Sequence, residues 1–403
     1  MTRISLAIWL AGFAVRLTLV FGFHRYELFR AEPVKIAVSL AKTGAFANPY
    51  SIPTGFTAHA APLYPIAIAP LYRFFGDSRT ADFARIVFSI AIASASYALL
   101  PAVAAALGIP LTAGILAGLA GALLPAHYWP ESMGEFETAW VPLFLELSLI
   151  FFTRVIGSAA LLIRTAVYAG VWSGVGALLS PNVLPPLAGL GILMLWKRGA
   201  HSWRWLAVTA LAAFATITPW LVRDYVRLGG WFPIRDNFGL EFYLSNNDQA
   251  IAEIERNDVS PFYKQEHPFS SVAAARELLA QGELSFEWDR MHRASEWIKA
   301  NPTKFVLLTS ERVRNFWFHA MLPPVPRWLL WMLNVSALVG LWMLFRRNRW
   351  AALLLGSMLV TYPAAYYLIH NGMRYEHGVY WITLLLTGSA VYEVSTIPAK
   401  PKP

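Results

Sequence analysis

The sequence predicts an all-α polytopic membrane protein, with about ten transmembrane helices, interfacial helices in the first outer loop and a small helical periplasmic cap. Three observations lead to this prediction. The chain of 403 residues is 57% hydrophobic and only 14% charged, whereas soluble domains carry about 25% charged residues. Many of its apolar runs approach the length of about 20 residues that a helix needs to cross a bilayer. Its basic residues mostly flank these runs.

The apolar runs define the predicted spans in order along the chain. The region 165–196 is read as two short spans, because Ser180-Pro181-Asn182 and Pro185-Pro186 interrupt it. Short, proline-broken helices are tolerated at membrane depth where protein or a water-filled cavity satisfies the freed backbone groups. The predicted spans lie near 4–23, 84–106, 111–126, 138–153, 165–180, 182–196, 204–222, 326–345, 350–369 and 378–395.

The first run is predicted to be an uncleaved span. It is too long for a signal peptide, Arg16 interrupts it, and no small-residue cleavage site follows it. Arg16 is a functional candidate because a cation inside a membrane is costly, although an acid or a carbonyl of a neighbouring helix could neutralise it.

Charge asymmetry orients the predicted bundle. Positive clusters fall in short connections that lie on one face if Arg3 is inside, so both termini are predicted to be cytoplasmic. The connections 24–83, 127–137, 223–325 and 370–377 then lie on the opposite face, which is periplasmic in a bacterium. The clusters are Arg154 with Arg164, Lys197 with Arg198 and Arg204, Arg346 with Arg347 and Arg349, and Lys400 with Lys402.

Three parts follow from this organisation. Residues 1–222 form an N-terminal transmembrane module whose first outer loop is 24–83, residues 223–325 form the helical cap, and residues 326–403 form the C-terminal transmembrane helices. The helical pattern of the cap covers 272–281, 285–300 and 303–320, with a break at Asn301-Pro302.

Composition also excludes several kinds of site and partner. The absence of cysteine rules out disulfides, thiolate metal sites and thiol nucleophiles. The net charge of +9 would suit nucleic acid, but no basic pattern stands apart from the membrane segments, so no nucleic-acid partner is expected. The histidines show no metal-ligand spacing on one helix, and His370 and His377 with Glu376 fit hydrogen bonding better than cation binding. No required metal is predicted.

The first outer loop contains the leading catalytic candidate. A short interfacial helix is predicted from Pro33 to Gly44, because proline is accepted at a helix start and glycine is a good stop. Glu32 then stands at the N-terminus, where the helix dipole favours an ionised carboxylate that can accept a proton. The alternative is that Glu32 caps the helix or pairs with Arg30 or Lys35.

Two other features of the sequence have structural interpretations. The spacings Gly114-x-x-x-Gly118 and Gly170-x-x-x-Gly174 predict close packing of helices. Asp82 is interpreted as a partner of Arg79 or Arg85.

Three blocks of sequence are similar to one enzyme family. Residues 32–49, 53–58 and 61–65 resemble the first outer loop of bacterial membrane glycosyltransferases of the type C superfamily, family 39-like. These are relatives of protein O-mannosyltransferases and lipid A aminoarabinose transferases. A second block covers 217–225, 233–241 and 245–247, and a third covers 370–377. The sequence differs from the family pattern in two places. In the first outer loop, Phe29-Arg30 stand where many relatives have an Asp-Glu pair. In the third block, Asn371 and Gly378 stand where the pattern usually has prolines.

The resemblance implies an inverting glycosyltransferase that moves a sugar from a polyprenyl-phosphate donor to an acceptor on the outer face of the inner membrane. No cofactor is implied, membrane lipids surround the protein, and the acceptor is a lipid, a glycan or a protein. A transporter or flippase is the alternative, and a lipid-linked polymerase or ligase of the cell envelope is a third hypothesis. The resemblance assigns Glu32 as catalytic base and Glu137 as a second acid, and it gives as substrate-binding residues Arg223, Arg235, Arg374, Lys35, Tyr64 and His377.

Overall fold

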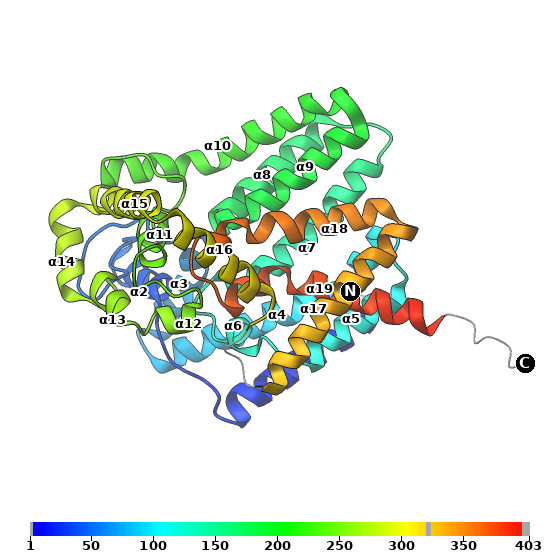
Figure 1. Cartoon of the computed structure of the whole chain (residues 1–403), viewed down its shortest axis with the longest axis horizontal. Coiled ribbons are helices and arrows are strands. Elements are labelled where there is room, and N and C mark those ends of the chain that lie inside the picture. Colours follow the sequence, from blue (N-terminus) through cyan, green and yellow to red (C-terminus); the bar gives the residue numbers. More distant parts are fainter. Residues whose placement is uncertain (1–2, 320–323, 397–403) are drawn as a thin grey trace, which may run out of the picture.

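The computed structural model describes residues 3–319 and 324–396, and the described residues are helical with no β-strand (Figure 1). This agrees with the predicted all-α class. Lys400 and Lys402, and positions 320–323 of the predicted cap, lie outside the described residues.

Within residues 3–319 and 324–396, five helices are long and apolar enough to cross a membrane. All five fall on predicted spans. They are Arg3–Gly22 (α1, Arg3–Leu17, continued by a π-helical turn, Thr18–Gly22), α4 (Arg79–Leu107), Glu137–Gly157 (a 3-10 turn, Glu137–Ala139, followed by α7, Trp140–Gly157), α10 (Trp203–Leu228) and Arg327–Arg347 within α17 (Pro324–Arg347).

The other predicted spans are also occupied by helices, but these are shorter or more polar. Two of them, α5 (Leu111–Leu123) and α8 (Ile163–Leu179), are short and apolar. The remainder are α9 (Leu184–Arg198), α18 (Arg349–Thr361, continued by a 3-10 turn, Tyr362–Tyr367) and α19 (Met373–Ser395). Almost every residue of α19 from Glu376 to Ala390 is buried, so this helix is enclosed by its neighbours.

Glycines let several of these helices pack closely. A Cβ atom added to Gly174 of α8 would lie 2.6 Å from the Thr216 Cβ of α10, and one added to Gly114 of α5 would lie 2.7 Å from the Ala104 Cβ of α4. Neither distance leaves room for a side chain. The close packing predicted from the two glycine spacings is therefore confirmed.

Two amphipathic helices lie in the first connection, as the sequence predicts. Helix α2 spans Glu32–Thr43 and α3 spans Leu63–Phe75. Glu32 is the first residue of α2, Pro33 follows it, and Gly44 ends the helix in the left-handed conformation with φ 72°. Glycine adopts this conformation without steric cost, which explains why the helix stops there.

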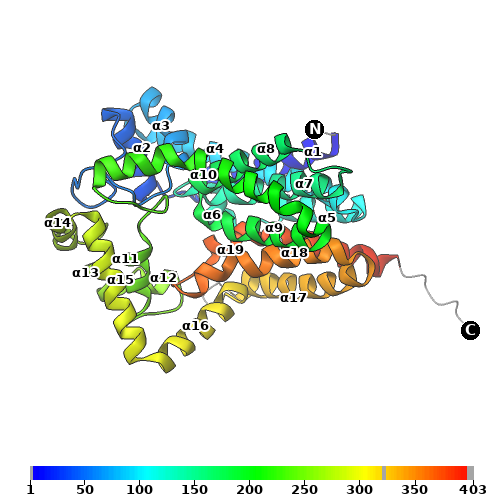
Figure 2. The same ribbon diagram turned by 90° about the horizontal axis from the view of Figure 1, so that it is seen from above.

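Between α10 and α17 the chain forms a group of shorter helices. Several of them share an apolar cluster that includes Leu240, Leu244, Leu278 and Phe286 and also receives Tyr50 from the first connection. The helices are α11 (Phe238–Ser245), α12 (Ile254–Asn257), α13 (Pro261–Glu266), α14 (Val272–Gln281), α15 (Glu283–Ala300) and α16 (Pro302–Trp317). Figure 2 shows α2, α3 and α11 to α15 gathered at one end of the long axis, and the last turns of α19 (red) at the other.

Candidate functional site

A cavity of about 670 Å³ lies where the connections at this end of the molecule meet. Every connection predicted to lie on the outer face contributes to its wall. The connection between α8 and α9 contributes as well. The contributing segments are 29–33, 59–60, 135–138, 180–184, 233–241, 258–270 and 362–375.

Four of the residues predicted from the sequence line this cavity: Glu32, Glu137, Arg235 and Arg374. They come from separate elements, respectively the start of α2, the 3-10 turn before α7, the connection after α10, and the first turn of α19. The fold therefore brings two predicted acids and two predicted cations to one cavity.

Glu32 is held without a strong ion pair. Its Oε1 lies 3.9 Å from Nε2 of His267, and burial lowers the pKa of His267 to about 3, so this imidazole is neutral. Burial raises the pKa of Glu32 above its usual value, against the opposing effect of Arg374, Lys35 and Arg235. A carboxylate with a raised pKa in a cavity is suited to accept a proton near neutral pH.

The suggested pairing of Glu32 with Arg30 is wrong. The Arg30 guanidinium binds Asp77, and it binds Asp82 at 2.9 Å. Asp82 lies 3.6 Å from Arg85, so one of the two partners predicted for Asp82 is near it and Arg30 is an additional one.

The two cavity arginines keep part of their hydrogen-bonding capacity. Arg374 Nη2 donates to the Tyr375 hydroxyl at 2.7 Å, and its guanidinium lies 4.4 Å from the ring centre of Phe136. Its Nε has no hydrogen-bond partner among the described residues. Arg235 Nε donates to Asn237 Oδ1 at 2.7 Å, and Nη1 lies 3.8 Å from Glu137 Oε1. Both guanidinium groups can therefore accommodate an anion at the cavity wall.

Three further acids line the cavity and were not singled out from the sequence: Glu135, Glu241 and Asp258. Burial is the main cause that raises the pKa of Glu135 to about 7, of Glu241 to about 7 and of Asp258 to about 8. Glu241 ends a family-like block and Glu135 lies two residues before Glu137, so both had a weak sequence signal. Asp258 had none.

Two predicted substrate-binding cations lie outside the residues that line the cavity. Arg223 donates to the carbonyls of Thr57 at 2.7 Å and Phe46 at 2.8 Å, so it holds the first connection against α10. Lys35 donates to the Tyr50 carbonyl at 3.0 Å and lies 4.0 Å from the ring centre of Phe269. Both side chains are engaged by protein groups in this structure.

Tyr64 and His377 also lie outside the cavity lining. The Tyr64 hydroxyl donates to the Gly134 carbonyl and is buried in the apolar core. His377 is 3% exposed, and its Nδ1 lies 3.9 Å from Glu131 Oε1. Packing of α3 and α19 into the bundle therefore turns both residues toward the interior.

Arg16 is neutralised inside the bundle. It binds Glu131, and its Nη2 donates to the Gly121 carbonyl at 2.9 Å. The Tyr97 hydroxyl donates to the other Glu131 oxygen at 2.6 Å. The interpretation of Arg16 as a cation paired with a neighbouring acid and carbonyl is the one that the structure supports.

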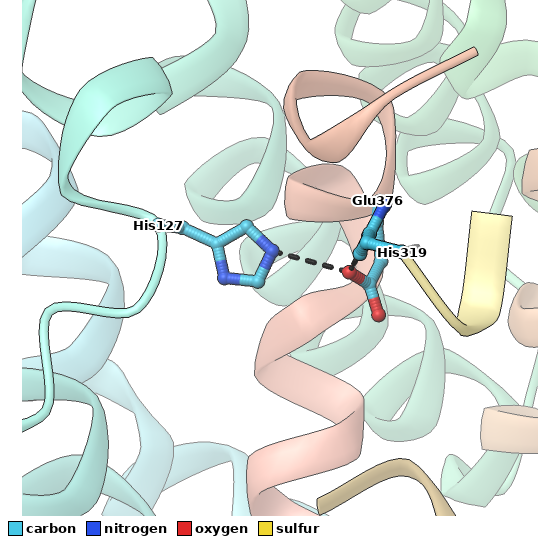
Figure 3. Close-up of side chains that lie close together, drawn as sticks. All are labelled: His127, His319 and Glu376. Atoms are coloured by element: carbon cyan, nitrogen blue, oxygen red, sulfur yellow. Dashed lines mark hydrogen bonds and ion pairs between the residues drawn. The ribbon is translucent and has the colours of Figure 1, made fainter. Parts of the chain in front are cut away.

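Glu376 joins three segments at a second buried cluster, shown in Figure 3. Its Oε2 lies 3.2 Å from His127 Nε2 and 2.6 Å from His319 Nε2. Its Oε1 accepts a hydrogen bond from Asn334 Nδ2 at 2.9 Å. Glu376 therefore makes hydrogen bonds, as predicted, although its partners differ from His370 and His377.

No known protein-family model matches the chain, and no curated protein matches it. The resemblance to type C glycosyltransferases therefore stays a prediction, and the functional argument rests on the cavity and its residues.

Proposed function

We propose that this protein is an inverting membrane glycosyltransferase, which moves a sugar from a polyprenyl-phosphate donor to an acceptor on the outer face of the inner membrane. The observation behind this proposal is that one cavity contains Glu32 together with Arg235 and Arg374. An acid that can take a proton and guanidinium groups that can bind phosphate are the two requirements of this reaction.

The proposed step is a single displacement. A hydroxyl or amine of the acceptor attacks the anomeric carbon from the face opposite the lipid phosphate, and its proton passes to Glu32. The bond between the anomeric carbon and the phosphate oxygen breaks, and the phosphate leaves with the electron pair. Because the incoming and leaving groups occupy opposite faces, the configuration at the anomeric carbon inverts.

Arg374 and Arg235 are assigned to the leaving phosphate. Negative charge builds up on the phosphate oxygens as the bond breaks, and guanidinium donors at the cavity wall would stabilise it. Glu137, 3.8 Å from Arg235, is assigned to orient that guanidinium or the acceptor. No cofactor is needed for this reaction.

A ten-span topology, with the predicted cap at the outer face, is part of the proposal and has support from both ends of the bundle. The outer connections all reach the cavity. At the other end, Asn348 Nδ2 donates to the Leu107 carbonyl at 2.9 Å, and Arg198 donates to the Ser158 carbonyl. Connections assigned to the same face therefore contact each other.

The test is release of polyprenyl phosphate from a polyprenyl-phosphate sugar by the purified protein. We expect Glu32→Gln to lower turnover by at least about 100-fold, as the loss of a general base does. Glu27→Gln is the matched control, because Glu27 is an exposed carboxylate of the same connection. Near-normal turnover of Glu32→Gln would reject this residue as the base, and no release by the wild-type protein with any such donor would reject the function.

A transporter or flippase is the alternative. Broken helices and a cation inside the membrane would suit a transporter, but Arg16 is bound to Glu131 and to backbone carbonyls. The same assay separates the two functions, because a transporter moves its substrate without breaking the bond between sugar and phosphate.

A further inference from the structure

Beside the cavity, one histidine and three carboxylates gather in the protein interior. His59 belongs to the first connection, Asp236 to the connection after α10, and Glu283 and Glu287 lie one turn apart at the start of α15. Their exposed fractions are 4%, 7%, 6% and 5%, respectively. None of the four is used in the proposed reaction.

The hydrogen bonds of this cluster are incomplete. Glu283 Oε1 accepts from Thr57 Oγ1 at 2.8 Å and from the Ala58 amide at 2.6 Å, and Glu287 Oε2 accepts from the Leu240 amide at 2.7 Å. Both carboxylate oxygens of Asp236, and Oε1 of Glu287, have no donor among the described residues. Buried carboxylate oxygens without a donor or a counter-ion are strongly unfavourable, so the cluster requires a positive partner.

Protons alone are one possible partner. Burial, with the nearby Glu283 and Glu287, raises the pKa of Asp236 well above its usual value. Asp236 and Glu283 could then share a proton. A metal ion would neutralise more charge than a single proton, and the geometry decides whether one can be held.

The ligand atoms converge. His59, Asp236 and Glu287 each place one nitrogen or carboxylate oxygen within 4.8 Å of the others. The Tyr50 hydroxyl bonds Nδ1 of His59 at 2.9 Å, which fixes the ring and leaves Nε2 for a ligand. A metal ion binds the neutral form of an imidazole, which the burial of His59 favours.

The cluster around Glu376 in Figure 3 provides a contrast. There, the two carboxylate oxygens already accept hydrogen bonds from Asn334, His127 and His319. The oxygens of Asp236 have no such donors. Of these two clusters, the one beside the cavity is therefore the one whose carboxylate oxygens lack donors among the described residues.

We propose that His59, Asp236 and Glu287, with Glu283 beside them, bind a divalent cation. Carboxylate oxygens with a single imidazole suit Mn²⁺, which accepts both ligand types. The ion would join the first connection, the connection after α10 and helix α15, which are far apart in the sequence. It would thereby fix the cavity wall, because His59 also lines the cavity.

The test uses the full chain, stripped with a chelator and titrated with MnCl₂ near neutral pH. We expect one Mn²⁺ per chain and an unfolding temperature that rises by several degrees at saturation, because the ion binds the folded state only. CaCl₂ in a parallel titration shows whether an ion that prefers oxygen ligands can replace Mn²⁺. Bound metal is counted by elemental analysis, so the readout is independent of sugar transfer.

Two amide variants test whether the proposed ligands bind the ion. Asp236→Asn and Glu287→Gln should each abolish the response to Mn²⁺, while remaining at least as stable as the metal-free wild type, because each removes a buried negative charge. Glu296→Gln is the control, since Glu296 lies on α15 with its side chain 53% exposed, and it should respond as wild type does. A wild type that binds no Mn²⁺ and is stabilised only by acidification would overturn the proposal in favour of the shared proton. Retention of the response in both amide variants would also overturn it.

Discussion

Buried acidic residues in this protein differ mainly in what neutralises them. Glu131 is paired with Arg16 and accepts the Tyr97 hydroxyl, so it is fixed inside the bundle. Glu32 lies 3.9 Å from a neutral imidazole, and Arg374, Lys35 and Arg235 act on it over a longer range. A carboxylate held in this way can change its protonation state, as the proposed base must.

Replacement of Arg374 by lysine tests its assignment to the donor phosphate. Arg374→Lys keeps the charge but removes the planar fork of donors, so we expect the KM for the lipid-linked donor to rise about tenfold. Arg223→Lys is the matched comparison. Since Arg223 holds the first connection through the Thr57 and Phe46 carbonyls, that variant should lower the unfolding temperature. The reverse pattern would mean that the two roles are exchanged.

Glu241 provides a test based on pH. Burial raises the pKa of Glu241 to about 7 in the folded protein, so the folded state binds this proton more tightly than the unfolded state does. Stability should therefore fall as the pH rises from about 4 to about 7, and the loss should be complete above that range. Relative to wild type, Glu241→Gln should gain about 3 kcal/mol in free energy of unfolding at pH 8 and nothing near pH 4. Unfolding followed across this pH range measures the difference, and an equal effect at both pH values would rule out the titration of Glu241.

At the scale of helices, close packing depends on a few glycines. Gly174 faces Thr216 of α10 with no space for a side chain, whereas Gly157, at the end of α7, has no atom within 4 Å of its added Cβ. Gly174→Leu should therefore destabilise the protein by about 1–3 kcal/mol, and Gly157→Leu should have little effect. Thermal unfolding in detergent compares the two variants, and equal stability would show that α8 and α10 can separate without cost.

Local signals explain why so much of the helical arrangement could be predicted. Apolar run length, the left-handed stop at Gly44 and the break at Asn301-Pro302 act over a few residues, so the sequence alone reveals them. The start of α2 at Glu32 follows from such signals too. These features located the helices but could not establish how many of them cross a membrane.

Contacts between distant segments explain what could not be predicted. The family resemblance assigned Arg223 to substrate binding, but the first connection folds back, and its Thr57 and Phe46 carbonyls accept the hydrogen bonds of this guanidinium. Asp258 enters the cavity because the chain beyond α11 returns to the start of α19, and no local pattern indicates this. The Asp236 cluster likewise joins three segments that the sequence separates.

At the scale of the whole molecule, the proposed topology places the first connection and the connection after α7 on opposite faces of the membrane. The native chain has no cysteine, so single cysteines can report on each side without background labelling. In sealed vesicles, Ser51→Cys in the first connection and Ala159→Cys after α7 should react with a membrane-impermeant maleimide from opposite sides. Both positions are exposed in the structure. Labelling of both from the same side would reject the proposed topology.

The most direct measurement is a structure of the protein bound to a polyprenyl phosphate. We expect the phosphate to lie in the cavity of about 670 Å³, within hydrogen-bonding distance of Arg374 and Arg235, with Glu32 facing the space that a sugar would occupy. A phosphate bound elsewhere, beyond the reach of both arginines, would contradict the proposal that sugar transfer takes place in this cavity.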